Sequence, residues 1–74
     1  MSRLAIKSEI SGTVWKIETK PGDTLEADGI LLILESMKME IPVLAPRKGR
    51  VVEIRVSEGE SVAEDQVLAL FDVT

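Results

Sequence analysis

The sequence aligns with itself without a gap when it is shifted by 37 positions. Residues 12–35 then lie over residues 49–72, and most aliphatic residues are exchanged for other aliphatic residues. A repeat that keeps its turn glycines and its aliphatic positions in phase indicates two halves with the same local structure. The identical positions, each with its partner 37 residues later, are Gly12, Val14, Ile17, Gly22, Asp28 and Leu31.

Each half has the pattern of β-structure. Residues 13–19 mix β-branched and aromatic residues with polar ones, as expected of a half-buried strand. Residues 20–23, Lys-Pro-Gly-Asp, fit a type II turn, and residues 57–60 keep its glycine. The short apolar runs at 30–34 and 67–71 predict buried strands.

A helix over residues 30–40 is the alternative, because Leu, Met, Glu and Lys favour helices. Gly29 and Pro42 leave such a helix too little length, and its repeat partner has a strand pattern. We therefore expect an all-β fold, in which the halves pack with pseudo-twofold symmetry as a small antiparallel sandwich or flattened barrel. The centre of the chain, near Lys38, should lie opposite the chain termini.

The composition excludes several classes of function. The 74 residues suit a single domain over 1–74, with little room for a catalytic cleft. Cysteine and histidine are absent, which removes thiolate chemistry and the commonest general base and metal ligand. A net charge of -4 argues against nucleic-acid binding. No apolar run is long enough to cross a membrane or to form a signal peptide, so we expect a cytoplasmic protein. From the missing residue types and the small size, we expect that it is not an enzyme and holds no metal.

Three other features have structural interpretations. Trp15 is expected to pack on the sheet, with contact to a partner protein as the less favoured alternative. Gly22 and Gly59 are turn residues, because no helix follows that could make a phosphate-binding loop. Asp28 and Asp65 occur at equivalent positions of the repeat, so they are expected to shape turns.

The segment between the repeats, residues 35–42, carries the candidate chemistry. The strands on its two sides lie so close in sequence that a tight hairpin must join them. Met37 and Lys38 are the predicted central residues of that turn, with Lys38 projecting into solvent. Methionine on both sides of an exposed lysine is unusual, and its flexible side chain suits contact with a partner protein.

The hexapeptide Glu35-Ser36-Met37-Lys38-Met39-Glu40 resembles the biotin-attachment signature, in which a lysine between two methionines is biotinylated. Together with Gly12, Pro21-Gly22-Asp23, Gly49 and Glu58-Gly59-Glu60, it makes nearly the whole chain resemble the biotinyl/lipoyl attachment domain family, with short free-standing biotin/lipoyl attachment proteins as the nearest type. Lysines of lipoyl domains more often stand between aspartate and alanine, so the methionines favour biotin. The Ala-Pro that often precedes the first glycine in this family is replaced by Ser8-Glu9-Ile10-Ser11.

The resemblance implies a carrier. Lys38 would be the nucleophile that a biotin protein ligase acylates, with Met37, Met39, Glu35 and Glu40 as recognition residues. A lysine side chain is protonated in neutral water, and a chain without histidine relies on the ligase to remove that proton. The resemblance further implies two partners, a biotin carboxylase that loads the tethered biotin and a carboxyltransferase that unloads it.

Two alternatives remain open at this point. The same lysine could carry lipoate and serve acyl or methylamine transfer. The chain could also be an unmodified structural or interaction module of the same fold. The sequence does not identify the carboxylase or the acceptor of the carboxyl group.

Overall fold

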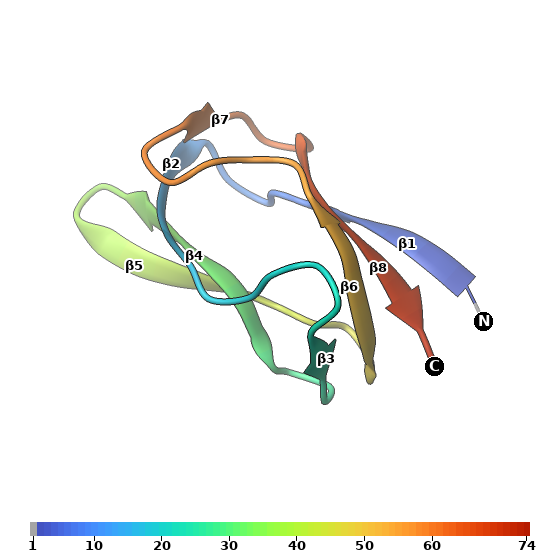
Figure 1. Cartoon of the computed structure of the whole chain (residues 1–74). Helices are drawn as coiled ribbons and strands as arrows, with labels where there is room; N and C mark the ends of the chain where they lie inside the picture. The colour runs from blue at the N-terminus through green and yellow to red at the C-terminus, as the bar shows by residue number, and fades with distance from the viewer. Residues whose placement is uncertain (1) are drawn as a thin grey trace.

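The computed structural model describes residues 2–74, which form eight strands and no helix (Figure 1). The strands are β1 (Ser2–Lys7), β2 (Gly12–Ile17), β3 (Thr24–Leu25), β4 (Ile30–Ser36), β5 (Met39–Leu44), β6 (Gly49–Ile54), β7 (Ser61–Val62) and β8 (Val67–Val73).

The strands form two four-stranded antiparallel sheets, ordered β1-β8-β6-β3 and β5-β4-β2-β7. We call them the terminal sheet and the hairpin sheet, after the chain ends and the β4–β5 hairpin that they contain. The all-β fold with two antiparallel sheets is as expected from the sequence.

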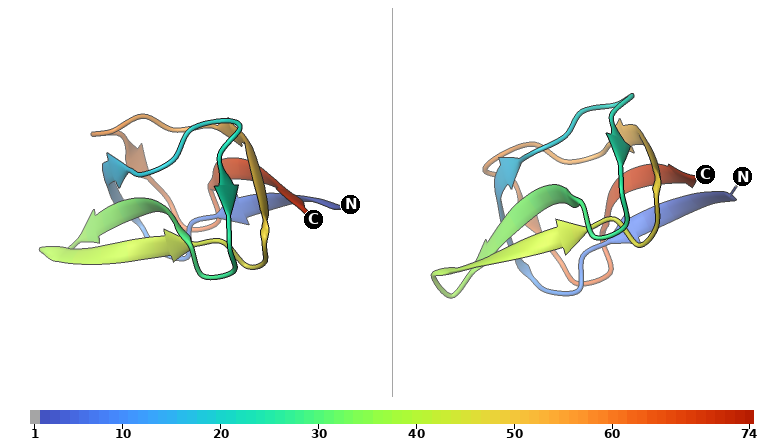
Figure 2. Two further views of the ribbon diagram at one scale, coloured as in Figure 1. Left: turned by 60° about the horizontal axis from the view of Figure 1, so that its bottom comes forward. Right: turned by 90° about the horizontal axis from the view of Figure 1, so that it is seen from below.

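The two sheets are copies of one another under the 37-residue shift. Each strand of the first half has a partner of equal length 37 residues later, β1 with β5 and β4 with β8 among them. The repeat therefore also includes residues 2–7 and 39–44, which the sequence comparison did not assign to it. Chain ends and hairpin lie at opposite ends of a molecule that measures 35 × 17 × 17 Å (Figure 2).

The halves are interleaved. The terminal sheet takes β1 and β3 from the first half and β8 and β6 from the second, and the hairpin sheet does the reverse. The halves thus pack with the pseudo-twofold symmetry expected from the repeat, and they do so by exchanging strands.

The turns repeat as faithfully as the strands. The amide of Asp23 donates to the carbonyl of Lys20 at 3.0 Å, and the amide of Glu60 donates to that of Ser57 at 3.1 Å. Gly22 and Gly59 have φ of 98° and 89°, which confirms a type II turn in both halves. Asp28 and Asp65 also occupy matching left-handed conformations, with φ of 69° and 70°, and shape turns as predicted.

Ser8 takes the place that Ala45 has in the other half. The amide of Ser8 donates to Gln66 O at 2.9 Å, and the amide of Ala45 donates to Gly29 O at 2.8 Å. Both residues are buried. The Ser8 hydroxyl donates to Ile10 O at 2.6 Å, so the buried oxygen has a partner. The symmetry of the backbone thus persists where the sequence departs from the Ala-Pro pattern.

The core lies between the sheets and draws on both halves. Inward-facing aliphatic residues of the long strands meet the one phenylalanine of the chain, Phe71. The largest fully buried side chains are Phe71, Leu31, Leu32, Leu34, Leu68, Val14 and Val51. Because Leu32 and Leu34 belong to β4, the same packing that forms the core anchors the base of the hairpin.

Candidate functional site

Lys38 lies at the tip of the β4–β5 hairpin. Ser36 pairs with Met39, so Met37 and Lys38 are the two central residues of the turn, as predicted. Their φ angles are 53° and 65°, and positive φ at both positions defines a type I′ turn. Residues other than glycine, asparagine and aspartate rarely adopt this left-handed region of backbone conformation. The register of the hairpin, fixed by five further cross-strand pairs, holds them there.

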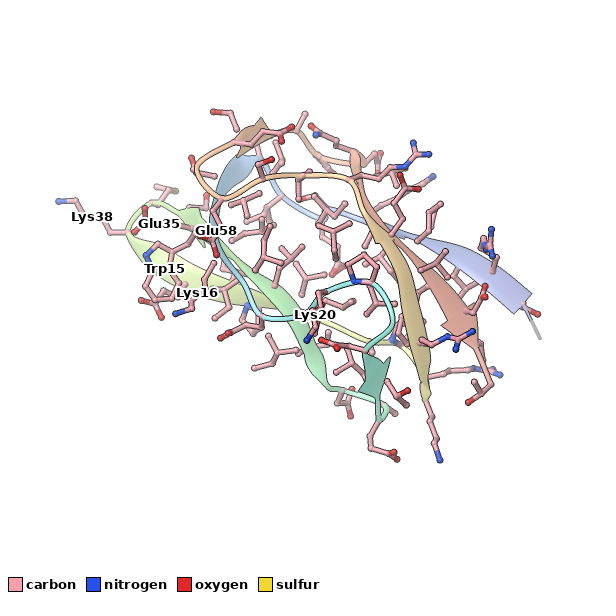
Figure 3. All side chains as sticks on the ribbon, in the orientation of Figure 1. Trp15, Lys16, Lys20, Glu35, Lys38 and Glu58 are labelled. Carbon is pink, nitrogen blue, oxygen red and sulfur yellow. The ribbon has the colours of Figure 1, made fainter. Side chains whose placement is uncertain are left out.

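The side chains of the turn extend into solvent. Met37 is 91% exposed and Met39 is 63% exposed. Lys38 is exposed as well and points away from both sheets (Figure 3). A lysine amine presented in this way is open to a large partner, and the two methionines offer an apolar surface beside it.

Glu35 and Glu40 stand below the turn and pair directly across β4 and β5. Like charges in such a pair destabilise a sheet. The equivalent pair of the terminal sheet is Arg3 and Asp72, whose Nε and Oδ1 atoms are 3.1 Å apart. The hydrogen bond from Arg3 lowers the pKa of Asp72, and the same bond raises the pKa of Arg3. The fold therefore accepts an ion pair at a position where the hairpin has two carboxylates.

Gly12 lets β2 approach the base of the hairpin. A Cβ at Gly12 would lie 2.6 Å from the carbonyl oxygen of Glu35, which is too close for any other residue without movement of the backbone. The hydroxyl of Ser36 donates to Ser11 O at 3.1 Å and adds a second link. The sequence marked Gly12 as a repeated glycine, but only the structure shows that it supports the hairpin.

Trp15 lies on the outer face of the hairpin sheet and is 47% exposed. The register of β2 against β4 shifts between Val14 and Lys16, so Trp15 is the extra residue of a β-bulge. Figure 3 shows Trp15 beside Lys16, at the end of the molecule that carries Lys38. After the bulge, the amide of Ile17 donates to the Glu58 carboxylate at 2.9 Å and ties β2 to the neighbouring turn.

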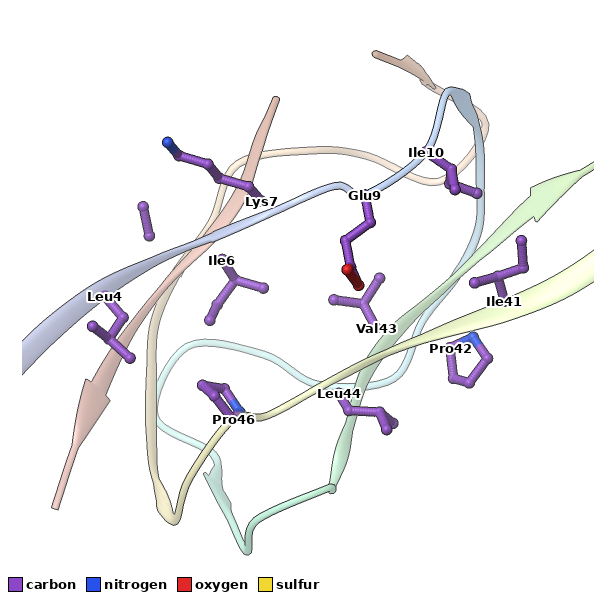
Figure 4. A pocket seen from close by; sticks show the side chains of 11 residues that line it. Leu4, Ile6, Lys7, Glu9, Ile10, Ile41, Pro42, Val43, Leu44 and Pro46 are labelled. Atoms are coloured by element: carbon purple, nitrogen blue, oxygen red, sulfur yellow. The ribbon is translucent and has the colours of Figure 1, made fainter. Parts of the chain in front are cut away.

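An open groove of about 440 Å³ runs between the edge strands β1 and β5 (Figure 4). Its walls are mostly aliphatic, with Lys7 and Glu9 as the charged groups. These two side chains come from one segment, and the groove has neither the depth nor the converging polar groups of a catalytic pocket.

Residues 2–74 contain no cluster of three or more carboxylates that could hold a metal ion. They also contain no helix that could span a membrane.

Comparison with known proteins identifies the family. The model of a biotin/lipoyl family described as "Biotin-requiring enzyme" matches residues 4–71. The chain is 43% identical over 65 residues to the biotin/lipoyl attachment protein of Bacillus subtilis, covering 88% of this chain and 89% of that protein. It is 37% identical over 65 residues to the biotinylated protein TB7.3 homolog of Mycobacterium leprae, covering 88% of this chain and 92% of that protein.

A solved structure supports the same assignment. The crystal structure of the Kluyveromyces lactis urea carboxylase superposes with a TM-score of 0.91 at 30% identity. The superposition covers 97% of this chain and 6% of the carboxylase chain. Family, fold and an exposed hairpin lysine agree, and the chain therefore belongs to the biotin/lipoyl attachment domain family, whose members are non-catalytic carriers that hold biotin or lipoate covalently on a lysine.

Proposed function

We propose that this chain is a biotin carboxyl carrier and that Lys38 is the residue that holds biotin. The observation that carries the proposal is the type I′ turn, which presents Lys38 between two exposed methionines. The M. leprae relative is a homolog of a biotinylated protein, and the superposed structure is a urea carboxylase. Both relationships favour biotin over lipoate.

The proposed attachment step is acyl transfer from biotinyl-adenylate, supplied by a biotin protein ligase. The Lys38 ammonium loses a proton to the ligase, and Nζ then attacks the carbonyl carbon of the adenylate. The new amide bond forms as the bond to phosphate breaks and AMP leaves. The chain contains no histidine, the commonest general base, so it contributes presentation through the turn and recognition through Met37, Met39, Glu35 and Glu40.

The exposed hairpin tip suits a cofactor that moves between two partner proteins. An amide-linked arm at an exposed tip can reach two separate partners, while the packed base of the hairpin keeps the pivot in place. When attached, biotin supplies a nitrogen that carries a carboxyl group. The proposed partners are a biotin carboxylase and a carboxyltransferase, between which tethering raises the effective concentration of the cofactor. The proposed location is the cytoplasm.

Intact mass spectrometry tests the attachment. The chain is incubated with biotin, ATP and a biotin protein ligase, beside a Lys38→Arg variant and beside lipoate with a lipoate ligase. We expect one biotinyl increment on the wild-type chain and none on the variant. A lipoyl increment alone would assign the chain to acyl transfer. No increment with either ligase, each shown active on another carrier, would favour an unmodified interaction module.

A second assay tests the carrier role. The biotinylated chain is incubated with a biotin carboxylase, ATP and radiolabelled bicarbonate, and protein-bound label is counted. We expect label on the biotinylated chain only. A chain that accepts biotin but gains no label with carboxylases from several sources would contradict the carboxyl-carrier role and leave the attachment site intact.

A further inference from the structure

The two sheets give the molecule an internal control, because equivalent positions of one fold carry different residues. The outer face of the terminal sheet shows what folding alone accepts at each position. Where the outer face of the hairpin sheet differs, folding did not require the difference.

The hairpin sheet has the more apolar outer face. Trp15 stands where the terminal sheet has Val52, and Leu44 stands where it has Lys7. Trp15 is 47% exposed, and the facing pair Ile30 and Leu44 are each 42% exposed. The outer apolar residues of the hairpin sheet are Trp15, Ile30, Ile33, Pro42 and Leu44, opposite Val52, Val67, Leu70, Ala5 and Lys7 in the terminal sheet.

This apolar face is continuous with the hairpin. Glu35 and Ile33 are alternate residues of β4, so they lie on one side of the sheet with Glu40 and Pro42 of β5. Trp15 lies beside Ile33 and Leu34, four to five residues from Lys38, which is roughly 15 Å along a strand. A protein interface of ordinary size has a radius of roughly 16 Å, so one partner centred on Lys38 can cover Trp15.

From these observations we infer that the Trp15 face of the hairpin sheet is a docking surface for the biotin protein ligase; the inference rests on the proposed function. The ligase must bring its acyl group into bonding contact with Lys38 itself. A partner of the loaded carrier can react at the end of the arm, about ten bonds from the lysine Cα and so on the order of 10 Å away. The ligase is therefore the partner whose chemistry brings it closest to the sheet.

The occupant has a defined chemistry. Trp15 fits an apolar pocket, since tryptophan is prominent among interface residues that dominate binding energy. Glu35 and Glu40, between Trp15 and the turn, fit basic side chains at the edge of that pocket. The ligase surface is thus expected to be apolar opposite β2 and basic opposite the hairpin base.

The test exchanges Trp15 for the residue of its counterpart. Trp15→Val copies Val52, which the fold accepts at the equivalent position, and Val52→Ala trims the other face as a matched control. Steady-state biotinylation of each purified carrier gives kcat and KM, and circular dichroism checks folding. We expect Trp15→Val to raise KM about tenfold or more with kcat within about twofold, as lost binding requires. Val52→Ala should stay within about twofold of wild type.

A second measurement keeps Trp15 in place and so does not depend on the Trp15→Val substitution. Trp15 is the only tryptophan, so 5-fluorotryptophan gives one ¹⁹F resonance, observed in a Lys38→Arg carrier while unlabelled ligase is added. We expect that resonance to shift or broaden on binding. An unchanged KM in folded Trp15→Val, or an unchanged resonance at saturating ligase, would overturn the inference. Failure of the wild-type chain to accept biotin would instead remove the proposed function, and the inference with it.

Discussion

Glu35 and Glu40 illustrate how one residue pair can differ between two copies of a fold. Their counterparts, Asp72 and Arg3, form an ion pair across β8 and β1. Folding gains nothing from two facing carboxylates, whereas the proposed contact with basic side chains of a ligase would account for them.

Replacing Glu40 with arginine should stabilise the chain. The Glu40→Arg substitution removes the repulsion and copies the Arg3 arrangement, so the free energy of unfolding should rise by roughly 0.5 kcal/mol. Urea unfolding of the wild type, Glu40→Arg and Glu40→Gln measures the gain and separates lost repulsion from new attraction. A decrease in stability for both variants would show that Glu40 makes a favourable contact with Glu35 or its surroundings.

Asp72 predicts an acid-dependent loss of stability. Its pKa in the folded chain is lowered, chiefly by the hydrogen bond from Arg3, from an ordinary value of 3.8. A lowered carboxyl pKa contributes stability that is complete above the ordinary value and is lost as the pH falls through the folded value. Asp72→Asn should therefore be less stable than wild type at neutral pH, and the difference should shrink below pH 3.8. Urea unfolding at several pH values checks this, and a difference that is constant down to pH 2 would contradict it.

For individual residues, the sequence predicted where in the fold a residue lies better than it predicted the backbone conformation of that residue. Spacing placed Met37 and Lys38 in the turn, because only a two-residue loop fits between the paired strands. It did not predict positive φ at both residues, since type I′ turns usually contain asparagine or glycine. Nor did it predict the bulge that leaves Trp15 half exposed, because the shift in register depends on how β2 pairs with β4.

At the element scale, the hairpin depends on a glycine that lies outside it. Gly12→Ala places a methyl group against Glu35 O and should cost about 1–3 kcal/mol, as overpacking does. Because the clash is at the hairpin base, hydrogen exchange should rise most in β4 and β5. Gly59→Ala is the control, since its Cβ would meet nothing within 4 Å and only its φ of 89° opposes the change. Equal exchange in β4–β5 for both variants would contradict the role of Gly12.

The sequence also predicted most of the longer strands but not the pairing between them. The apolar runs of β4 and β8 and the turns after β2 and β6 were evident from local patterns. β1 was missed because residues 2–7 alternate only weakly, and only pairing with β8 makes them a strand. The two-residue strands β3 and β7 are too short to leave a pattern in the sequence. Pairing partners more than 30 residues apart, such as β2 and β7, depend on tertiary contacts that local patterns do not contain.

At the scale of the whole molecule, interleaving makes each half dependent on the other. Within the first half only β2 and β4 pair, whereas β1 and β3 pair with strands of the second half. A peptide of residues 1–37 should therefore be unfolded by circular dichroism, since a two-stranded ribbon is marginal in water. Mixing it with a peptide of residues 38–74 should restore β-structure. A cooperative thermal transition in the first peptide alone would contradict this expectation.

The Met37–Lys38 turn joins the two halves of the repeat. Ser36 and Met39 flank the turn, and their counterparts Val73 and Ser2 pair in the same way at the other end. A two-residue link from Val73 to Ser2 would therefore close the backbone into a ring with a second hairpin of equal geometry. Circular permutation at the Met37–Lys38 turn would then preserve the fold. A Met-Lys pair in the new link of the ring would place a second exposed lysine at the opposite pole, beside Arg3 and Asp72 instead of two glutamates.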